Sequence, residues 1–181
     1  QLNLQNAEAH LNRGIAHRQD GNVRAAIADY TEAIRLNPLY VEAYNNRALA
    51  YFRIGDLKKA MTDFDEAIRL NPQRVEIYVN RAAVRGQNGD LEGVITDCTE
   101  AIRLNPQYEQ AYMNRGIARC DSGDLDGAIA DCTEAIRLNP NLTDVYYNRG
   151  RARSDWGDLD GAIADFSEAI RRNPSDSASS V

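Results

Sequence analysis

Two histidines and three cysteines are the residues of this chain best suited to acid-base, nucleophilic or metal-binding chemistry. His10 and His17 are seven residues apart, which can place both on one helix face, but no third ligand accompanies them. Cys98, Cys120 and Cys132 have neither the CxxC spacing of a zinc site nor the even number of a disulfide framework. No glycine-rich phosphate loop or hydrolase nucleophile motif is present. We therefore expect a protein that is not an enzyme and uses no metal or cofactor.

The overall composition argues against two kinds of partner, nucleic acids and membranes. Hydrophobic residues make up 43% of the 181 residues, charged residues make up 27%, and the net charge is −6. A negative chain is poorly suited to binding phosphate backbones, and its apolar runs are far shorter than the roughly 18 residues that a membrane-spanning helix requires. We predict no nucleic-acid partner and no membrane insertion. The odd number of cysteines favours a reducing, cytoplasmic location.

Proline and glycine each recur at a fixed interval of 34 residues. The prolines are Pro38, Pro72, Pro106, Pro140 and Pro174, and the glycines are Gly21, Gly55, Gly89, Gly123 and Gly157. A period of this size indicates a stacked array of supersecondary units. The repeats occupy residues 7–40, 41–74, 75–108, 109–142 and 143–176. Residues 1–6 are interpreted as the remnant of a preceding repeat and residues 177–181 as a polar tail, within one structural domain.

Each repeat is predicted to contain two helices, A at repeat positions 2 to 14 and B at positions 17 to 30. The glycine at position 15 forms the turn between them. The next residue is Asn22 in the first repeat and an aspartate in the others, both residue types that cap the free amides at a helix start. An Asn-Pro pair then ends helix B.

The recurring residues of each repeat resemble the sequence pattern of the tetratricopeptide repeat family. Repeat 2 shows the family pattern through Tyr44, Ala48, Tyr51, Ala60, Phe64, Ala67 and Pro72. The resemblance covers residues 7–176 and implies an all-α, right-handed superhelical solenoid of five 34-residue helix-turn-helix repeats. It also implies that the A helices line an inner, concave groove that binds a protein or peptide. Arginine replaces the family's leucine at position 7 in every repeat.

Position 6 lies on the open face of helix A and is asparagine in every repeat. These residues are Asn12, Asn46, Asn80, Asn114 and Asn148. An asparagine amide can pair with the N–H and C=O groups of an extended peptide. The resemblance supports this interpretation, because asparagine at this position binds peptide backbone in some members of the family. The alternative is that each asparagine bonds to a neighbouring helix and only sets the stacking.

Apolar and basic side chains complete the predicted groove. The apolar residues come from positions 5, 9 and 12 and are Leu11, Ile15, Leu49, Phe52, Val79, Met113, Ile117 and Tyr147. Arg18 and Arg53 add positive charge toward the N-terminal end. A contiguous apolar patch of this kind is typical of a binding site. With the five asparagines, these are the predicted groove residues.

Two further features of the repeats lead to structural predictions. Position 7 is arginine and position 23 is aspartate in all five repeats, as in Arg47 and Asp63, so we predict an ion pair that joins helices A and B. In the last repeat no further helix follows to cover Ile163, Phe166 and Ile170. This exposed C-terminal helix face is a candidate surface for self-association.

The sequence therefore favours a protein-protein interaction scaffold that binds an extended or helical peptide in its groove. Two alternatives remain. The chain could be the substrate-recruiting array of a larger enzyme, or a homo-oligomerisation module. The identity of the partner does not follow from the repeat pattern.

Overall fold

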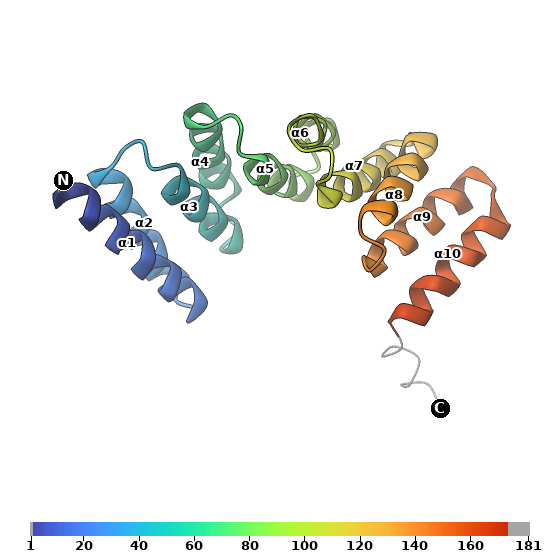
Figure 1. Ribbon diagram of the computed structural model, residues 1–181, viewed down its shortest axis with the longest axis horizontal. Coiled ribbons are helices and arrows are strands. Elements are labelled where there is room, and N and C mark those ends of the chain that lie inside the picture. The colour runs from blue at the N-terminus through green and yellow to red at the C-terminus, as the bar shows by residue number, and fades with distance from the viewer. Residues whose placement is uncertain (1, 174–181) are drawn as a thin grey trace. The chain divides into compact units, whose positions relative to one another are not determined.

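The computed structural model describes residues 2–173, which form ten α-helices and no strand (Figure 1). The helices are α1 (Leu2–Gln19), α2 (Val23–Leu36), α3 (Val41–Arg53), α4 (Leu57–Leu70), α5 (Val75–Gln87), α6 (Leu91–Leu104), α7 (Glu109–Ser122), α8 (Leu125–Leu138), α9 (Thr143–Trp156) and α10 (Leu159–Arg172). The odd-numbered helices are the A helices of the five repeats and the even-numbered helices are the B helices. The predicted polar tail, residues 177–181, lies outside the described residues.

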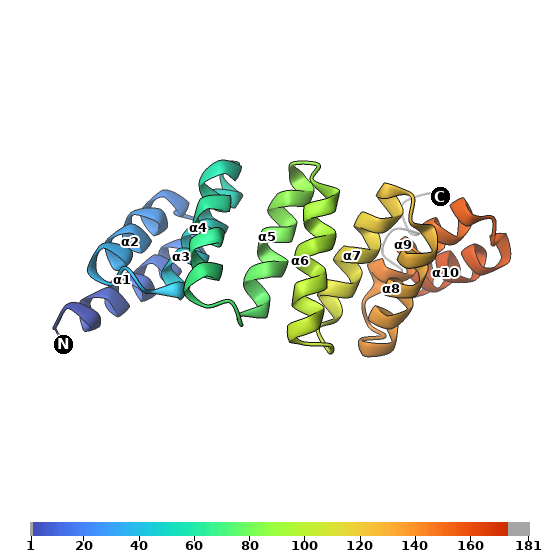
Figure 2. The same cartoon turned by 90° about the horizontal axis from the view of Figure 1, so that it is seen from above.

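The chain divides into two compact units, Gln1–Asn88 and Gly89–Val181. Helices α1 to α5 belong to the first unit and α6 to α10 to the second. Within each unit, helices adjacent in sequence pack on one another, as α3 and α4 do in the first and α9 and α10 in the second (Figure 2). The A helices α1, α3 and α5 also make contacts in order, and so do α7 and α9.

The turns between helices A and B form as the sequence predicts. The glycine at position 15 has a positive φ in every repeat, between 76° at Gly89 and 96° at Gly157, which a residue with a Cβ adopts only with strain. The following Asn or Asp caps helix B. Asn22, for example, accepts a hydrogen bond from the Ala25 amide at 3.2 Å, and Asp90 accepts one from Gly93 at 2.9 Å. Both predictions are confirmed.

The B helices end at the asparagine of the Asn-Pro pair. Asn37 is the C-cap of α2, and its side-chain oxygen accepts a hydrogen bond from the Leu39 amide, 3.2 Å away. Asn71, Asn105 and Asn139 make the same turn two residues onward. The asparagine therefore closes the turn while the proline prevents the helix from continuing.

The first A helix is longer than the others because it begins at Leu2. Residues 2–5 correspond in repeat phase to residues 104–107, where α6 ends at Leu104 and an Asn-Pro turn follows. Leu4 stands at the place of the proline, so nothing interrupts the helix there. That residues 1–6 derive from an earlier repeat stays a prediction.

Helix A has two buried faces in the core of the first unit. The first face packs on helix B of the same repeat, as the fully buried Ala48 does beside Phe64. The second consists of positions 3 and 10. In α3 these are Ala43 and Ala50, which are fully buried in the cluster that contains Tyr30 of the preceding repeat. Positions 3 and 10 therefore form the contact between repeats.

The second unit follows the same packing with smaller residues. Cys132 of α8 and Val145 of α9 are buried in one cluster, with Tyr112 and Met113 packed against it. Burial raises the pKa of Cys98 and of Cys132 to about 12. Both thiols are therefore neutral core groups.

Candidate peptide-binding surface

The predicted groove residues lie on the A helices, and each unit carries its own set. In the first unit they come from α1, α3 and α5, and in the second from α7 and α9. Because the A helices of each unit pack in order, equivalent positions on successive helices lie on the same side. We describe the two surfaces separately, as the first A-helix face and the second A-helix face.

Two asparagines of the first A-helix face are engaged in internal hydrogen bonds. The Asn46 amide donates to the Glu42 carbonyl one turn earlier in α3, at 2.8 Å. The Asn80 amide donates to the side-chain oxygen of Asn45 on α3, at 3.1 Å, and so links α5 to the preceding A helix. Asn80 thus makes the stacking bond that the sequence analysis kept as an alternative. The side-chain oxygens of Asn46 and Asn80 keep capacity to accept hydrogen bonds.

The apolar residues of the first A-helix face differ in how deeply they are buried. Leu11 and Val79 are each only 6% exposed, because both pack between helices, and so they offer little surface to a ligand. Ile15, Leu49 and Phe52 are half-buried. These three residues, with the exposed Asn12 and the half-buried asparagines, make up the accessible part of this face.

The two predicted arginines of this face have different surroundings. Arg53 is exposed at the end of α3. Arg18 is half-buried beside the phenol of Tyr30, whose pKa is raised by burial and lowered to a smaller extent by Arg18. Only Arg53 is therefore placed to attract an anionic group of a ligand.

The second A-helix face is the more open of the two. Asn114 and Asn148 are half-buried, and no hydrogen bond from either side chain is found within residues 2–173. Met113 and Ile117 are also half-buried, and Tyr147 is 55% exposed. The Tyr147 ring is held by a tilted contact with Phe166 of α10, with centroids 5.7 Å apart. Two available amides thus lie among apolar side chains on α7 and α9.

An ion pair between α7 and α9 borders the second A-helix face. Arg151 donates to Asp121 at 2.6 Å, and it also lies against the half-buried thiol of Cys120. The pair connects successive A helices through side chains that remain partly exposed, with 36% exposure for Arg151 and 44% for Asp121.

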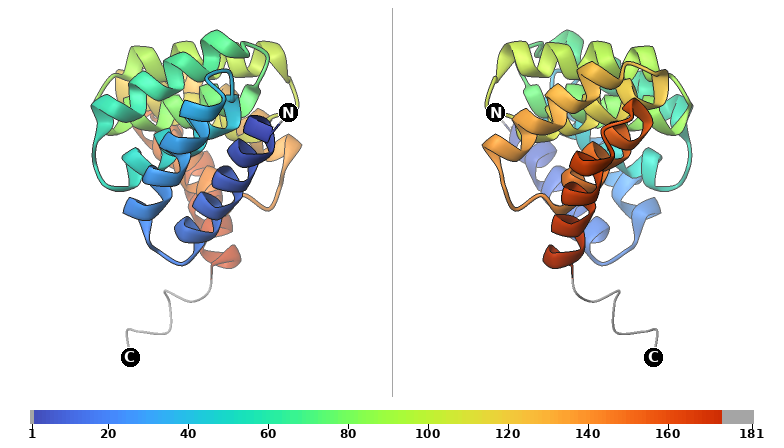
Figure 3. Two further views of the ribbon diagram at one scale, coloured as in Figure 1. Left: turned by 90° about the vertical axis from the view of Figure 1, so that its left-hand side faces the viewer. Right: turned by 90° about the vertical axis from the view of Figure 1, so that its right-hand side faces the viewer.

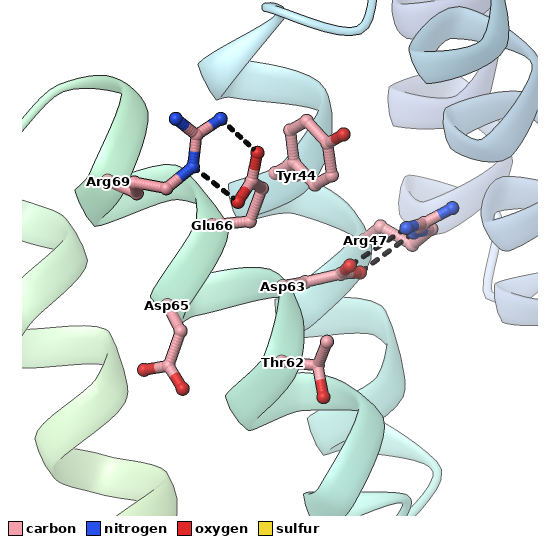
Figure 4. A pocket seen from close by; sticks show the side chains of 7 residues that line it. All are labelled: Tyr44, Arg47, Thr62, Asp63, Asp65, Glu66 and Arg69. Atoms are coloured by element: carbon pink, nitrogen blue, oxygen red, sulfur yellow. Dashed lines mark hydrogen bonds and ion pairs between the residues drawn. The ribbon is translucent and has the colours of Figure 1, made fainter.

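The arginine at position 7 is fixed by the aspartate at position 23, as predicted. Figure 4 shows the pair in repeat 2, where the Arg47 Nε donates to Asp63 at 2.7 Å and the Arg47 Nη2 donates at 2.8 Å. The same bidentate geometry joins Arg115 to Asp131. Repeats 1 and 5 have it as well. The pair holds helix A on helix B with the directional strength of a charge-assisted fork.

In repeats 4 and 5 the aspartate also accepts a hydrogen bond from the arginine at position 11, a contact that the repeat pattern alone did not predict. Arg119 donates to Asp131 at 2.9 Å, and Arg153 does the same to Asp165. In repeat 1 two imidazoles lie near Asp29: His10, at position 4, is 3.2 Å away, and His17, at position 11, is 3.8 Å away. Contacts with Asp29 therefore account for both histidines.

A polar hollow of about 550 Å³ lies beside the Arg47–Asp63 pair and is visible in Figure 4. Its lining residues are Tyr44, Arg47, Thr62, Asp63, Asp65, Glu66 and Arg69. Their charges are satisfied within the protein, since Glu66 pairs with Arg69 at 2.6 Å and Asp65 pairs with Arg81 at 2.6 Å. The hollow contains no predicted groove residue, and its composition is explained by the helix packing alone.

Across residues 2–173, no group of three or more His, Cys, Asp or Glu side chains is arranged to hold a metal ion. In the same part of the chain no helix is long and apolar enough to cross a membrane.

Within residues 2–173, helix hairpins with capped B helices, and A helices that contact one another within each unit, define a helical-repeat protein. Two sequence models described as tetratricopeptide repeat match the chain, one over residues 11–75 and the other over residues 109–142 and 143–176. Together they cover more than half of its length. The chain belongs to the tetratricopeptide repeat (TPR) family, as the resemblance predicted.

Solved structures show the same fold. MamA is 22% identical with a TM-score of 0.84, covering 98% of this chain and 97% of that chain. MamA from Desulfovibrio magneticus RS-1, from residue 41 to its end, is 19% identical with a TM-score of 0.86 over 97% and 98%. YrrB, a TPR protein with an unusual peptide-binding site, is 20% identical with a TM-score of 0.77 over 92% and 86%. No functionally curated protein sequence matches the chain.

Proposed function

We propose that this protein is an interaction scaffold that binds an extended peptide segment on its A-helix faces, and first on the face formed by α7 and α9. The observation that carries the proposal is the pair Asn114 and Asn148, whose amides make no hydrogen bond within the described residues while apolar side chains surround them. Both amides are half-buried and make no internal bond, so their donors and acceptors are open to a ligand that can hydrogen-bond to them.

The chemistry of this face suits a polypeptide. Each asparagine amide provides two donors and an acceptor, which match the alternating N–H and C=O groups of an extended chain. Met113 and Ile117 offer apolar surface for the ligand's side chains, and Tyr147 adds a ring with a hydroxyl group. Because backbone groups are common to all peptides, such a site tolerates many sequences and takes its selectivity from the apolar contacts.

The first A-helix face is proposed as a second, weaker contact region. Asn46 and Asn80 each use an amide N–H internally, so they can offer a peptide mainly their oxygens. Ile15, Leu49 and Phe52 supply the apolar surface there, and Arg53 the positive charge. The peptide-binding site of the TPR protein YrrB is consistent with a peptide ligand for a relative of this fold.

We also propose a reducing compartment such as the cytoplasm for this chain. All three cysteines are free, and Cys120 is half-buried rather than enclosed in the core. An accessible thiol persists most readily where the environment is reducing. The net charge of −6 further favours protein over nucleic acid as the partner.

A peptide-array screen tests the proposed site directly. The wild-type protein is incubated with an array of diverse peptides, and the tightest binder is then measured in solution. The Asn114→Ala/Asn148→Ala variant is expected to bind this peptide at least about tenfold more weakly, since each lost hydrogen bond contributes about 1 kcal/mol.

The matched control is Asn141→Ala, which removes an exposed asparagine of the loop before α9 that is not a groove residue. It should bind as the wild type does. Equal binding by the double variant and the control would refute the role of the two asparagines, and no selective binder on the array would refute the peptide function itself.

A further inference from the structure

The B helix of the last repeat, α10, has an apolar face that no other helix within residues 2–173 covers. Figure 3 (right) shows α10 nearest the viewer with no other helix of the second unit in front of it. We define the tail face as Leu159, Ile163, Ser167 and Ile170. The three apolar members are 61% to 64% exposed. In repeat 1 the equivalent residues are Val23, Ile27, Thr31 and Ile34, of which the apolar three pack into the cluster shared with α3.

The A helix of the first repeat, α1, has the side chains that in later repeats pack on the B helix of the preceding repeat. It is the helix drawn in dark blue in Figure 3 (left). We define the head face as Ala9, Arg13 and Ala16, all of which are exposed. The equivalent residues of α3 are Ala43, Arg47 and Ala50, and there both alanines are fully buried against the preceding repeat. The head face therefore has the side chains of an inter-repeat contact, and within residues 2–173 no repeat packs on it.

The polar side chains at these positions show the same difference between a contact inside the array and an open terminal face. At the contact between repeats, the arginine at position 7 uses its third nitrogen to reach the hydroxyl at position 25 of the preceding repeat. Arg47 donates to Thr31 at 3.1 Å, and Arg149 donates to Thr133 at 3.2 Å. Arg13 makes the fork to Asp29, but its Nη1 has no partner within residues 2–173. Its side chain is 62% exposed, compared with 16% for Arg47.

The hydroxyl that Arg13 lacks is present on the tail face. Ser167 occupies position 25, and it donates to the Ile163 carbonyl at 2.7 Å. Thr31 donates to Ile27 in the same way, also at 2.7 Å, while it accepts from Arg47. Ser167 is therefore oriented as an acceptor for an arginine at position 7, and no arginine within residues 2–173 donates to it.

We propose that the head face of one copy of this chain binds the tail face of a second copy, and so continues the repeat contact between molecules. The alanines of the head face would pack on Ile163 and Ile170 of the second copy, and Arg13 would donate to its Ser167. Such a contact joins two different surfaces, so a dimer still has one open head face, on one copy, and one open tail face, on the other. Association is then concentration-dependent and need not stop at a dimer.

The test is sedimentation velocity of the 181-residue chain over a concentration series, with one variant on each face. The wild type should shift to larger species as concentration rises. Ile163→Glu on the tail face and Ala16→Glu on the head face should each raise the dissociation constant at least about tenfold, because a charge enters an apolar contact. Both residues are exposed, so circular dichroism melting should be unchanged. Leu39→Glu, at a 69% exposed leucine outside both faces, is the matched control.

Mixing the two variants distinguishes this arrangement from other modes of association. Ile163→Glu keeps its head face and Ala16→Glu keeps its tail face, so an equimolar mixture should form a 1:1 dimer although each variant alone is monomeric. A wild type that stays monomeric at every concentration would overturn the proposal. So would association that Ile163→Glu abolishes and Ala16→Glu leaves intact, because that result indicates a symmetric contact between two tail faces.

Discussion

Replacing Asp131 by alanine should lower the free energy of unfolding of the second unit, because it removes a buried carboxylate that two arginines share. The Asp131 carboxylate is only 5% exposed and accepts hydrogen bonds from Arg115 at 2.8 Å and Arg119 at 2.9 Å. The alanine variant leaves two guanidinium groups, 13% and 25% exposed, without their shared anion. Breaking a buried pair costs about 3 to 5 kcal/mol. We expect the lower end, about 3 kcal/mol, because Arg119 also lies 3.4 Å from Asp124.

Urea unfolding followed by the fluorescence of Trp156, the only tryptophan, measures this loss in the second unit. With a slope of about 2 kcal/mol per molar urea, a loss of about 3 kcal/mol lowers the midpoint by about 1.5 M. The matched control is Glu134→Ala, three residues further along α8. Glu134 pairs with Arg137 at 2.7 Å, but that arginine side chain is 60% exposed. Exposed pairs contribute little, so the control midpoint should move by less than about 0.5 M.

A midpoint for Asp131→Ala that equals that of Glu134→Ala would refute the reasoning. It would mean that burial does not distinguish the two ion pairs, and that the arginine at position 7 in every repeat is not a structural replacement for leucine. A changed slope would indicate instead that the variant alters how cooperatively the unit unfolds.

Two further outcomes follow from the pKa values of particular groups. In the native protein one thiol, that of Cys120, should react with a thiol reagent, because burial raises the pKa of Cys98 and Cys132 to about 12, and all three should react in denaturant. A native count of three would contradict the burial of the other two. Arg171 and Arg172 lower the pKa of Glu168 to about 2, so its ion pairs stabilise the fold at pH above 4.5 and are lost as pH falls toward 2. Side-chain NMR titration of Arg172→Ala should show the Glu168 pKa moving upward toward 4.5, and an unchanged value would contradict the contact.

The helix boundaries were predictable because their signals are local. A glycine at position 15, a capping side chain after it and an Asn-Pro pair at the end act within a few residues, so the sequence alone places them. The Arg47–Asp63 pair was also predictable, because both residue types recur in every repeat at positions that face each other across one hairpin.

The contact between repeats was not predictable in the same way. Ala43 and Ala50 are fully buried, but alanine contributes little to an apolar pattern, so a helical wheel gives most weight to the larger residues of the other face. Which atoms Arg47 reaches on the preceding repeat depends on how the hairpins stack. The exact 34-residue recurrence of arginine at position 7 with a hydroxyl or Asp65 at position 25 was the available signal.

The predicted groove residues all lie on the A helices, but they differ in accessibility. Position 5 illustrates the difference: Val79 is buried between helices, whereas Tyr147, at the same position, is 55% exposed. The asparagines at position 6 differ as well, since the Asn80 side chain donates a hydrogen bond to a neighbouring helix and the Asn148 side chain does not. The repeat position sets the direction in which a side chain points from its helix. The size and polarity of its neighbours determine whether that side chain remains accessible.

Binding of a polypeptide to the face of α7 and α9 can be followed by NMR of the side-chain amides during titration with the tightest peptide from the array. The amide signals of Asn114 and Asn148 should shift with increasing peptide, and those of Asn141 should remain in place. Shifts confined to the B helices, with the two asparagine signals unmoved at saturation, would contradict binding to this face.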